Sequence, residues 1–172
     1  MAKVLMLDQQ NDQETANFCQ NQTNDNIVFE YITIPAKSLS FARNEAIRLC
    51  QTELLLYIDT DAIAASDWAS QLSDSLYKEN IGLAGGKILP KWHKKPSFIQ
   101  KSNVVLDQYS MLDLGDGEVE VKRIVGANFG LNLSRLGEIA NFDENLGRRE
   151  GKLISGEETQ LCTDAITSGL II

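Results

Sequence analysis

The chain has 172 residues, with 16 Lys and Arg against 24 Asp and Glu, which gives a formal net charge of −8 at pH 7. This acid excess argues against a surface for nucleic acid or anionic membranes, because phosphate contacts need clustered Lys and Arg. The longest apolar run, residues 54–58, is far shorter than the ~20 residues of a membrane helix. The N-terminus also lacks the pattern of a signal peptide. We therefore expect a cytoplasmic protein with a single globular domain.

The predicted elements of the first half alternate between strands and helices. Apolar and β-branched runs predict strands over residues 4–7, 27–34, 54–58 and 81–89. Helices are predicted between them, over residues 12–22, from an N-cap at Ser40, and from a cap at Ser66 or Asp67. This order predicts a parallel sheet with helices on both faces.

The second half is less regular. Residues 119–125 and 129–133 predict either two strands or one bent strand, and a helix is predicted from Ser155 to about Ser168. The last residues, 169–172, have the composition of the start of another strand.

The first candidate site is the sequence Asp59-Thr60-Asp61, which follows a buried strand. Ligands of open α/β sheets bind at the carboxyl ends of strands, and residues two apart in extended chain point to the same side. Mg²⁺ and Mn²⁺ take one or two carboxylates together with phosphate oxygens. Taken alone, these three residues favour a plain turn over a metal site.

The second candidate is the pair Glu157 and Glu158, which includes a potential general base if burial raises one pKa. The alternative is a capping box, in which Ser155 caps a helix and Glu158 returns a hydrogen bond to its backbone. The third candidate is Asn128, set among small residues in Gly126-Ala127-Asn128-Phe129-Gly130, where a ligand could approach the backbone. A bulge or tight turn is the alternative there.

The order and spacing of these motifs resemble the family 2 glycosyltransferases, inverting enzymes with the GT-A fold that use nucleotide-sugar donors. The similar segments are LDQQND at residues 7–12, SFARN at residues 40–44, LLLYIDTD at residues 54–61 with Trp68 after it, Gly85-Gly86, residues 126–147, and Gly156-Glu157-Glu158. The resemblance covers nearly the whole chain. It implies a nucleotide-diphospho-sugar transferase fold, a Rossmann-like α/β arrangement with a mixed sheet covered by helices on both faces.

The resemblance also implies a role for each matching residue. Asp8 would contact the nucleotide base, and Arg43 would help to hold the nucleotide. Asp59 and Asp61 would lie at the ribose and at a Mn²⁺ or Mg²⁺ ion, with Asp61 the better metal ligand. Asn128 would line the region of the donor sugar, and one of Glu158 and Glu157 would be the base, with Glu158 at the position of the acidic residue that the family usually uses. All of these are motif positions in this sequence.

The implied reaction is a single displacement in which the base deprotonates an acceptor hydroxyl and the sugar is transferred with inversion. The implied partners are a UDP- or GDP-sugar donor and a glycan or lipid-linked acceptor, with no nucleic acid. The implied setting is bacterial polysaccharide or envelope glycan synthesis at the inner face of the membrane.

The resemblance further implies that the family's first strand would precede residue 1 and that the chain would continue past residue 172. We therefore expect residues 1–172 to be a partial glycosyltransferase-like catalytic domain, truncated at both ends and lacking the family's first strand. A partner chain that completes the sheet is an associated expectation.

Two other functions remain open from the sequence. A haloacid-dehalogenase-like phosphatase also has a strand that ends in D-x-D, but Ile63 stands where that family has Thr or Val. A non-catalytic remnant, or a nucleotide-binding partner subunit, would keep the motifs without turnover.

Overall fold

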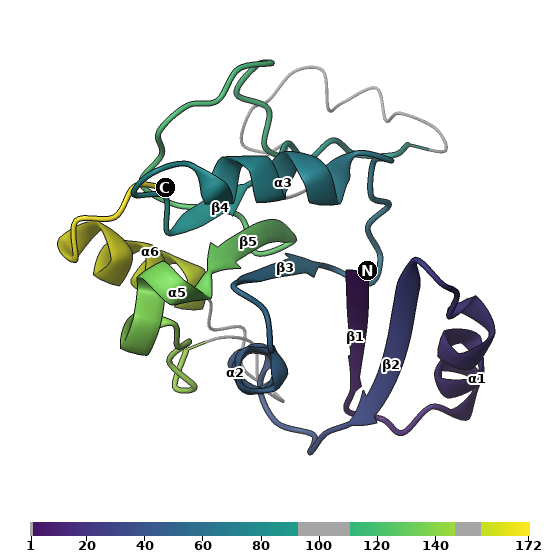
Figure 1. The fold of residues 1–172 in the computed structure, drawn as a ribbon. Helices are drawn as coiled ribbons and strands as arrows, with labels where there is room; N and C mark the ends of the chain where they lie inside the picture. The colour runs from purple at the N-terminus through teal and green to yellow at the C-terminus, as the bar shows by residue number, and fades with distance from the viewer. Residues whose placement is uncertain (1, 93–110, 147–155) are drawn as a thin grey trace. The chain divides into compact units, whose positions relative to one another are not determined.

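The computed structural model describes residues 2–92, 111–146 and 156–172, which form two compact units. The first unit comprises Met1–Cys50 and Phe142–Glu157, and the second comprises Gln51–Asn141 and Glu158–Ile172. Helices and strands occur in both units (Figure 1), as the predicted α/β class requires.

The first unit is built on two parallel strands, β1 (Ala2–Asp8) and β2 (Ile27–Thr33), which pair along their whole length. Helix α1 (Gln13–Gln22) connects them and lies beside β2 in Figure 1. Asp12 caps this helix by accepting hydrogen bonds from two backbone N–H groups of its first turn. The predicted strand, helix and strand of this region are confirmed.

Helix α2 (Leu39–Leu49) completes the regular part of the first unit, and its N-cap differs from the predicted one. The backbone of Ser38 is extended, and its Oγ accepts from the N–H of Phe41 at 3.1 Å. The prediction of Ser40 as the cap was wrong, because Ser38 already satisfies the first turn and Ser40 lies inside the helix, fully buried.

The second unit contains a three-stranded sheet in the order β3, β5, β4. Strands β3 (Leu54–Ile58) and β4 (Leu83–Gly85) both pair antiparallel with β5 (Asn128–Asn132), which lies between them. The prediction that these strands continue one parallel sheet was wrong, because β5 comes from much later in the chain and separates β3 from β4. Within the described residues, 119–125 form no strand.

Two longer helices lie wholly or mainly in the second unit, and the first of them supplies apolar residues to its core. Helix α3 (Trp68–Tyr77) buries Leu72 and Leu76, and Figure 1 shows it running along the sheet. A Cβ on Gly130 of β5 would lie 2.7 Å from Leu76 Cδ1, so only glycine allows this close packing. Helix α6 (Glu157–Thr167) is the predicted C-terminal helix, although its predicted start at Ser155 lies outside the described residues.

Short elements complete the second unit. Helix α5 (Leu133–Leu136) and the 3-10 helix η2 (Gly137–Ile139) follow β5 directly. Ile171 forms an isolated parallel bridge with Ile81, where the sequence predicted the start of a strand. Within the described residues, none of the helices has the length and apolar character needed to cross a membrane.

Candidate functional site

The candidate residues are divided between the two units. Asp8, Arg43 and Glu157 belong to the first unit, and Asp59, Asp61, Asn128 and Glu158 belong to the second. Within the first unit the structure brings Arg43 into contact with Glu157. Within the second it places Asp59 and Asp61 at the same end of the sheet as Asn128.

Asp8 is the last residue of β1, where its carboxylate is engaged by three donors. Tyr31 of β2 donates its hydroxyl to Oδ2 at 2.5 Å, and the backbone N–H groups of Gln10 and Asp12 donate to Oδ1 and Oδ2 at 2.7 and 2.6 Å. The hydrogen bond from Tyr31, followed by the two backbone bonds, lowers the pKa of Asp8. Asp8 is therefore ionised at neutral pH, and it keeps acceptor capacity for a ligand.

Arg43 and Glu157 form an ion pair away from solvent. Nη1 of Arg43 donates to Oε1 of Glu157 at 3.1 Å, and both residues are almost fully buried, at 5% and 3% exposure. The guanidinium also lies over the ring of Phe142, 5.4 Å from its centroid. Oε2 of Glu157 has no hydrogen-bond partner among the described residues. The carboxylate of Glu157 is thus committed to a buried cation, which argues against its use as a base.

Asp59 and Asp61 lie in a turn that follows β3. The N–H of Ala62 donates to the carbonyl of Asp59 at 3.0 Å, and the N–H of Asp59 donates to the carbonyl of Ala127 at 3.1 Å. Both aspartates are exposed. A turn and a metal site are therefore compatible here, because the turn fixes the backbone and both residues are exposed.

The donor set of this turn fits a hard divalent cation. Mg²⁺ and Mn²⁺ are bound through one or two carboxylates together with phosphate oxygens of a substrate. In the part of the chain that the structure describes, no group of three or more His, Cys, Asp and Glu side chains could hold a metal ion.

Asn128 begins β5, and its side-chain amide connects three elements. Its Oδ1 accepts from Nε1 of Trp68 at 2.7 Å, and its Nδ2 donates to the carbonyl of Lys87 at 3.3 Å. Trp68 begins α3, and Lys87 lies two residues after β4. A Cβ on Gly86 would lie 2.3 Å from Nδ2 of Asn128, so the glycine makes room for this amide. Among the contacts of the described residues, one N–H and one lone pair of this amide are not used.

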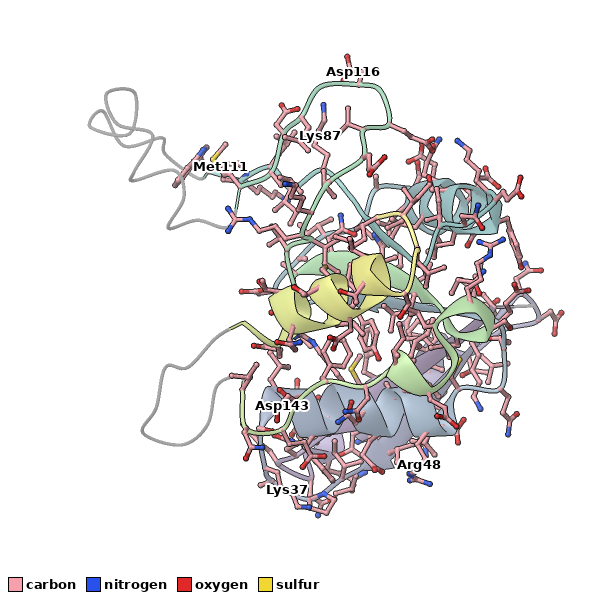
Figure 2. The ribbon with its side chains drawn as sticks, turned by 90° about the vertical axis from the view of Figure 1, so that its left-hand side faces the viewer. Lys37, Arg48, Lys87, Met111, Asp116 and Asp143 are labelled. Carbon is pink, nitrogen blue, oxygen red and sulfur yellow. The ribbon has the colours of Figure 1, made fainter. Side chains whose placement is uncertain are left out.

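Lys87 adds a positive group at the same end of the sheet. Its Nζ lies 3.0 Å from Asp113 and 2.9 Å from Asp116, and both Lys87 and Asp116 carry labels in Figure 2. Hydrogen bonds to these carboxylates, first Asp116 and then Asp113, raise the pKa of Lys87. The charge of Lys87 is therefore paired with these two carboxylates, while its backbone carbonyl contacts Asn128.

Glu158 is half-buried on the first turn of α6. Its charge contributes to raising the pKa of Cys162, one turn further along the helix, although burial of that thiol is the larger cause. In contrast to Glu157, Glu158 is accessible to solvent. The structure therefore gives different surroundings to two adjacent acids that the local sequence pattern alone left equivalent.

The sequence prediction missed Tyr31 and Lys87. In the parallel register Met6 pairs with Tyr31 and Asp8 with Thr33, so Tyr31 lies two pairs before the end of β1 and on the same face as Thr33. That register was the signal that could have identified the contact. Lys87 had no sequence signal, because its carboxylate partners lie 26 and 29 residues away along the chain.

Comparison with known proteins identifies the fold. The structure matches the mannosyltransferase PcManGT from Pyrobaculum calidifontis, solved in complex with GDP-Man and Mn²⁺, with a TM-score of 0.67 at 15% sequence identity. The match covers 98% of this chain and 44% of that protein. The chain therefore has the α/β fold of a GT-A glycosyltransferase.

Sequence comparison identifies the family. The chain is 27% identical over 128 residues to the glucosyl-dolichyl phosphate glucuronosyltransferase of Haloferax volcanii, a match that covers 73% of this chain and 41% of the relative. It thus spans less than half the length of the relatives it matches. The model of the glycosyl transferase family 2 matches residues 2–123, most of the chain. The haloacid-dehalogenase alternative is therefore wrong: the chain belongs to glycosyl transferase family 2.

Proposed function

We propose that this chain contains the donor-binding and catalytic residues of an inverting, metal-dependent glycosyltransferase that uses a UDP- or GDP-sugar. The observation that carries the proposal is the placement of Asp59 and Asp61 beside Asn128, at the end of the sheet, in a family 2 chain. The solved relative with GDP-Man and Mn²⁺ supports a nucleotide-sugar donor and a divalent cation.

Asp61, with Asp59 beside it, is the proposed metal-binding group, because both carboxylates are exposed on a fixed turn. A bound cation would neutralise the charge that develops on the departing diphosphate. Asp8 is ionised and retains an acceptor site, which suits recognition of an N–H group on the nucleotide base.

Glu158 is the proposed general base. A base must reach the hydroxyl that it deprotonates, and Glu158 is solvent-accessible whereas Glu157 is buried and paired with Arg43. Glu158 takes the proton of the acceptor hydroxyl, whose oxygen attacks the anomeric carbon from the face opposite the nucleotide. The configuration at that carbon inverts as the bond to the diphosphate breaks.

The proposed acceptor is a glycan or lipid-linked sugar at the cytoplasmic face of a membrane. The named activity of the Haloferax relative, which includes a dolichyl phosphate, supports a lipid-linked acceptor. Because that relative is archaeal, the proposed acceptor is not restricted to bacterial polysaccharides.

The test measures nucleotide binding and turnover separately. Isothermal titration with GDP and UDP, with and without Mn²⁺, is expected to show binding that depends on Mn²⁺. Hydrolysis of GDP-mannose, UDP-glucose or UDP-glucuronic acid then reports turnover. Asp61→Asn should lose the metal-dependent binding, and Glu158→Gln should bind normally but turn over at least about 100-fold more slowly. Asp74→Asn, an exposed position on α3, is the matched control.

The outcomes distinguish the alternatives. Turnover that persists in excess chelator would contradict a metal-dependent mechanism. Tight nucleotide binding without turnover of any donor would support the nucleotide-binding subunit instead, and no binding by a folded sample would support the non-catalytic remnant.

A further inference from the structure

Three polar side chains of α2 contact a segment about 100 residues further along the chain. Ser40, Arg43 and Asn44 are spaced i, i+3 and i+4, so they lie on one face of the helix. Oγ of Ser40 donates to the carbonyl of Leu146 at 2.8 Å. Asn44 binds both backbone groups of Phe142: Nδ2 donates to its carbonyl at 2.9 Å, and Oδ1 accepts from its N–H at 2.8 Å. The S-x-x-R-N spacing is therefore explained by contacts within the first unit.

The third contact of this helix face is the ion pair between Arg43 and Glu157. Glu157 is the first residue of α6, and Glu158, the proposed base, follows it directly. The two side chains of the pair are 6% and 4% exposed, so neither charge is screened by water. A buried carboxylate is stable as an anion only with a cationic partner, and removing that partner protonates or displaces it. The position of Glu157 thus depends on Arg43.

We infer that Ser40, Arg43 and Asn44, here called the α2 clasp, hold Leu146, Glu157 and Phe142, and that the contact of Arg43 with Glu157 fixes the first residue of α6 and so the position of the adjacent Glu158. Arg43 is then a positioning residue for the base and not a ligand of the nucleotide. This inference rests on the proposed function for the role of Glu158, but the contacts of the clasp are independent of it. Its distinguishing consequence is that loss of Arg43 lowers kcat and leaves donor affinity nearly unchanged.

Hydrogen exchange tests the clasp without any requirement for activity. In the full chain, Arg43→Gln is expected to speed exchange of the amides of Leu161 and Cys162 by at least about tenfold, because their helical hydrogen bonds end on the carbonyls of Glu157 and Glu158 in the first turn of α6. Arg48→Gln is the matched control, because Arg48 lies on the same helix but is 65% exposed and paired only with Glu45 among the described contacts. Figure 2 shows Arg48 at the outer edge of the molecule.

Steady-state kinetics test the positioning role, with whichever of GDP-mannose, UDP-glucose and UDP-glucuronic acid the wild-type chain turns over. Arg43→Gln should lower kcat by about 10- to 100-fold, the size expected for a misplaced catalytic group, with KM for the donor changed less than about twofold. Arg43→Lys, which keeps the charge, should restore part of kcat. If Arg43→Gln fails to fold, Glu157→Gln is the substitute variant. It keeps the shape of the side chain and should lower kcat by a similar factor.

Each outcome has a defined meaning. A rise in KM without a fall in kcat would overturn the inference, because it would make Arg43 a donor ligand. Unchanged exchange in α6, or unchanged kcat despite faster exchange, would overturn it as well. If the wild-type chain turns over no donor while Arg43→Gln still loosens α6, the proposed function fails and the clasp stands.

Discussion

Replacement of Gly86 by alanine tests whether the amide of Asn128 is held in the orientation described above. The new Cβ would lie 2.3 Å from Nδ2, 3.0 Å from Cγ and 3.1 Å from Oδ1 of Asn128. Because the amide is the end of a short side chain, it is expected to rotate away while the strands stay in place. It would then lose its hydrogen bonds to Trp68 and to the carbonyl of Lys87.

The magnitude follows from those two hydrogen bonds. Each contributes about 1 kcal/mol to the free energy of unfolding, so Gly86→Ala should cost about 2 kcal/mol. Asn128→Ala removes the same bonds and should cost a similar amount. In the double variant the alanine at residue 86 has no amide to displace, so the total should stay near 2 kcal/mol instead of reaching the additive value of about 4 kcal/mol.

Urea denaturation followed by tryptophan fluorescence and circular dichroism measures these differences. With an m value of about 2 kcal/mol/M, a loss of 2 kcal/mol lowers the midpoint by about 1 M. Gly117→Ala is the control, because a Cβ there meets nothing within 4 Å, and its midpoint should be unchanged or slightly higher. If the losses in free energy of unfolding of Gly86→Ala and Asn128→Ala simply add in the double variant, the two residues do not act through the same hydrogen bonds, and the prediction is refuted.

Three further predictions concern ionisation, thiol accessibility and metal. The pKa of Asp8 is lowered mainly by the hydrogen bond from Tyr31, so Tyr31→Phe should raise this pKa towards its ordinary value in an NMR titration. The stabilisation of the fold by this contact is present above the ordinary aspartate pKa and is lost as the pH falls through the lowered pKa. A pKa of Asp8 that is the same in Tyr31→Phe and wild type would contradict the contact. Iodoacetamide should label partly exposed Cys50 first and reach buried Cys19 and Cys162 only on unfolding, as mass spectrometry of digests can check; early labelling of either buried thiol would contradict their burial. Excess EDTA should abolish donor turnover, and added Mn²⁺ should restore it.

Local patterns in the sequence determined most of the individual elements. The strand predicted over residues 54–58 and the helix predicted over residues 12–22 lie at or near the observed bounds of β3 and α1, because their signals act within a few residues. The N-cap of α2 was misplaced by two residues, since two serines of equal propensity compete there and only the backbone conformation selects Ser38. The motif order also identified the family, which the family model confirms.

Tertiary structure alone decided the pairing of the sheet and the partners of the site residues. Strand β5 separates β3 from β4 because hydrogen bonding between strands depends on long-range packing, which no local pattern encodes. For the same reason the local sequence pattern, without the resemblance to the family, did not distinguish the adjacent acids Glu157 and Glu158. The fold buries one against Arg43, 114 residues earlier, and leaves the other accessible to solvent. Burial and a distant cation, both properties of the folded chain, distinguish two identical side chains.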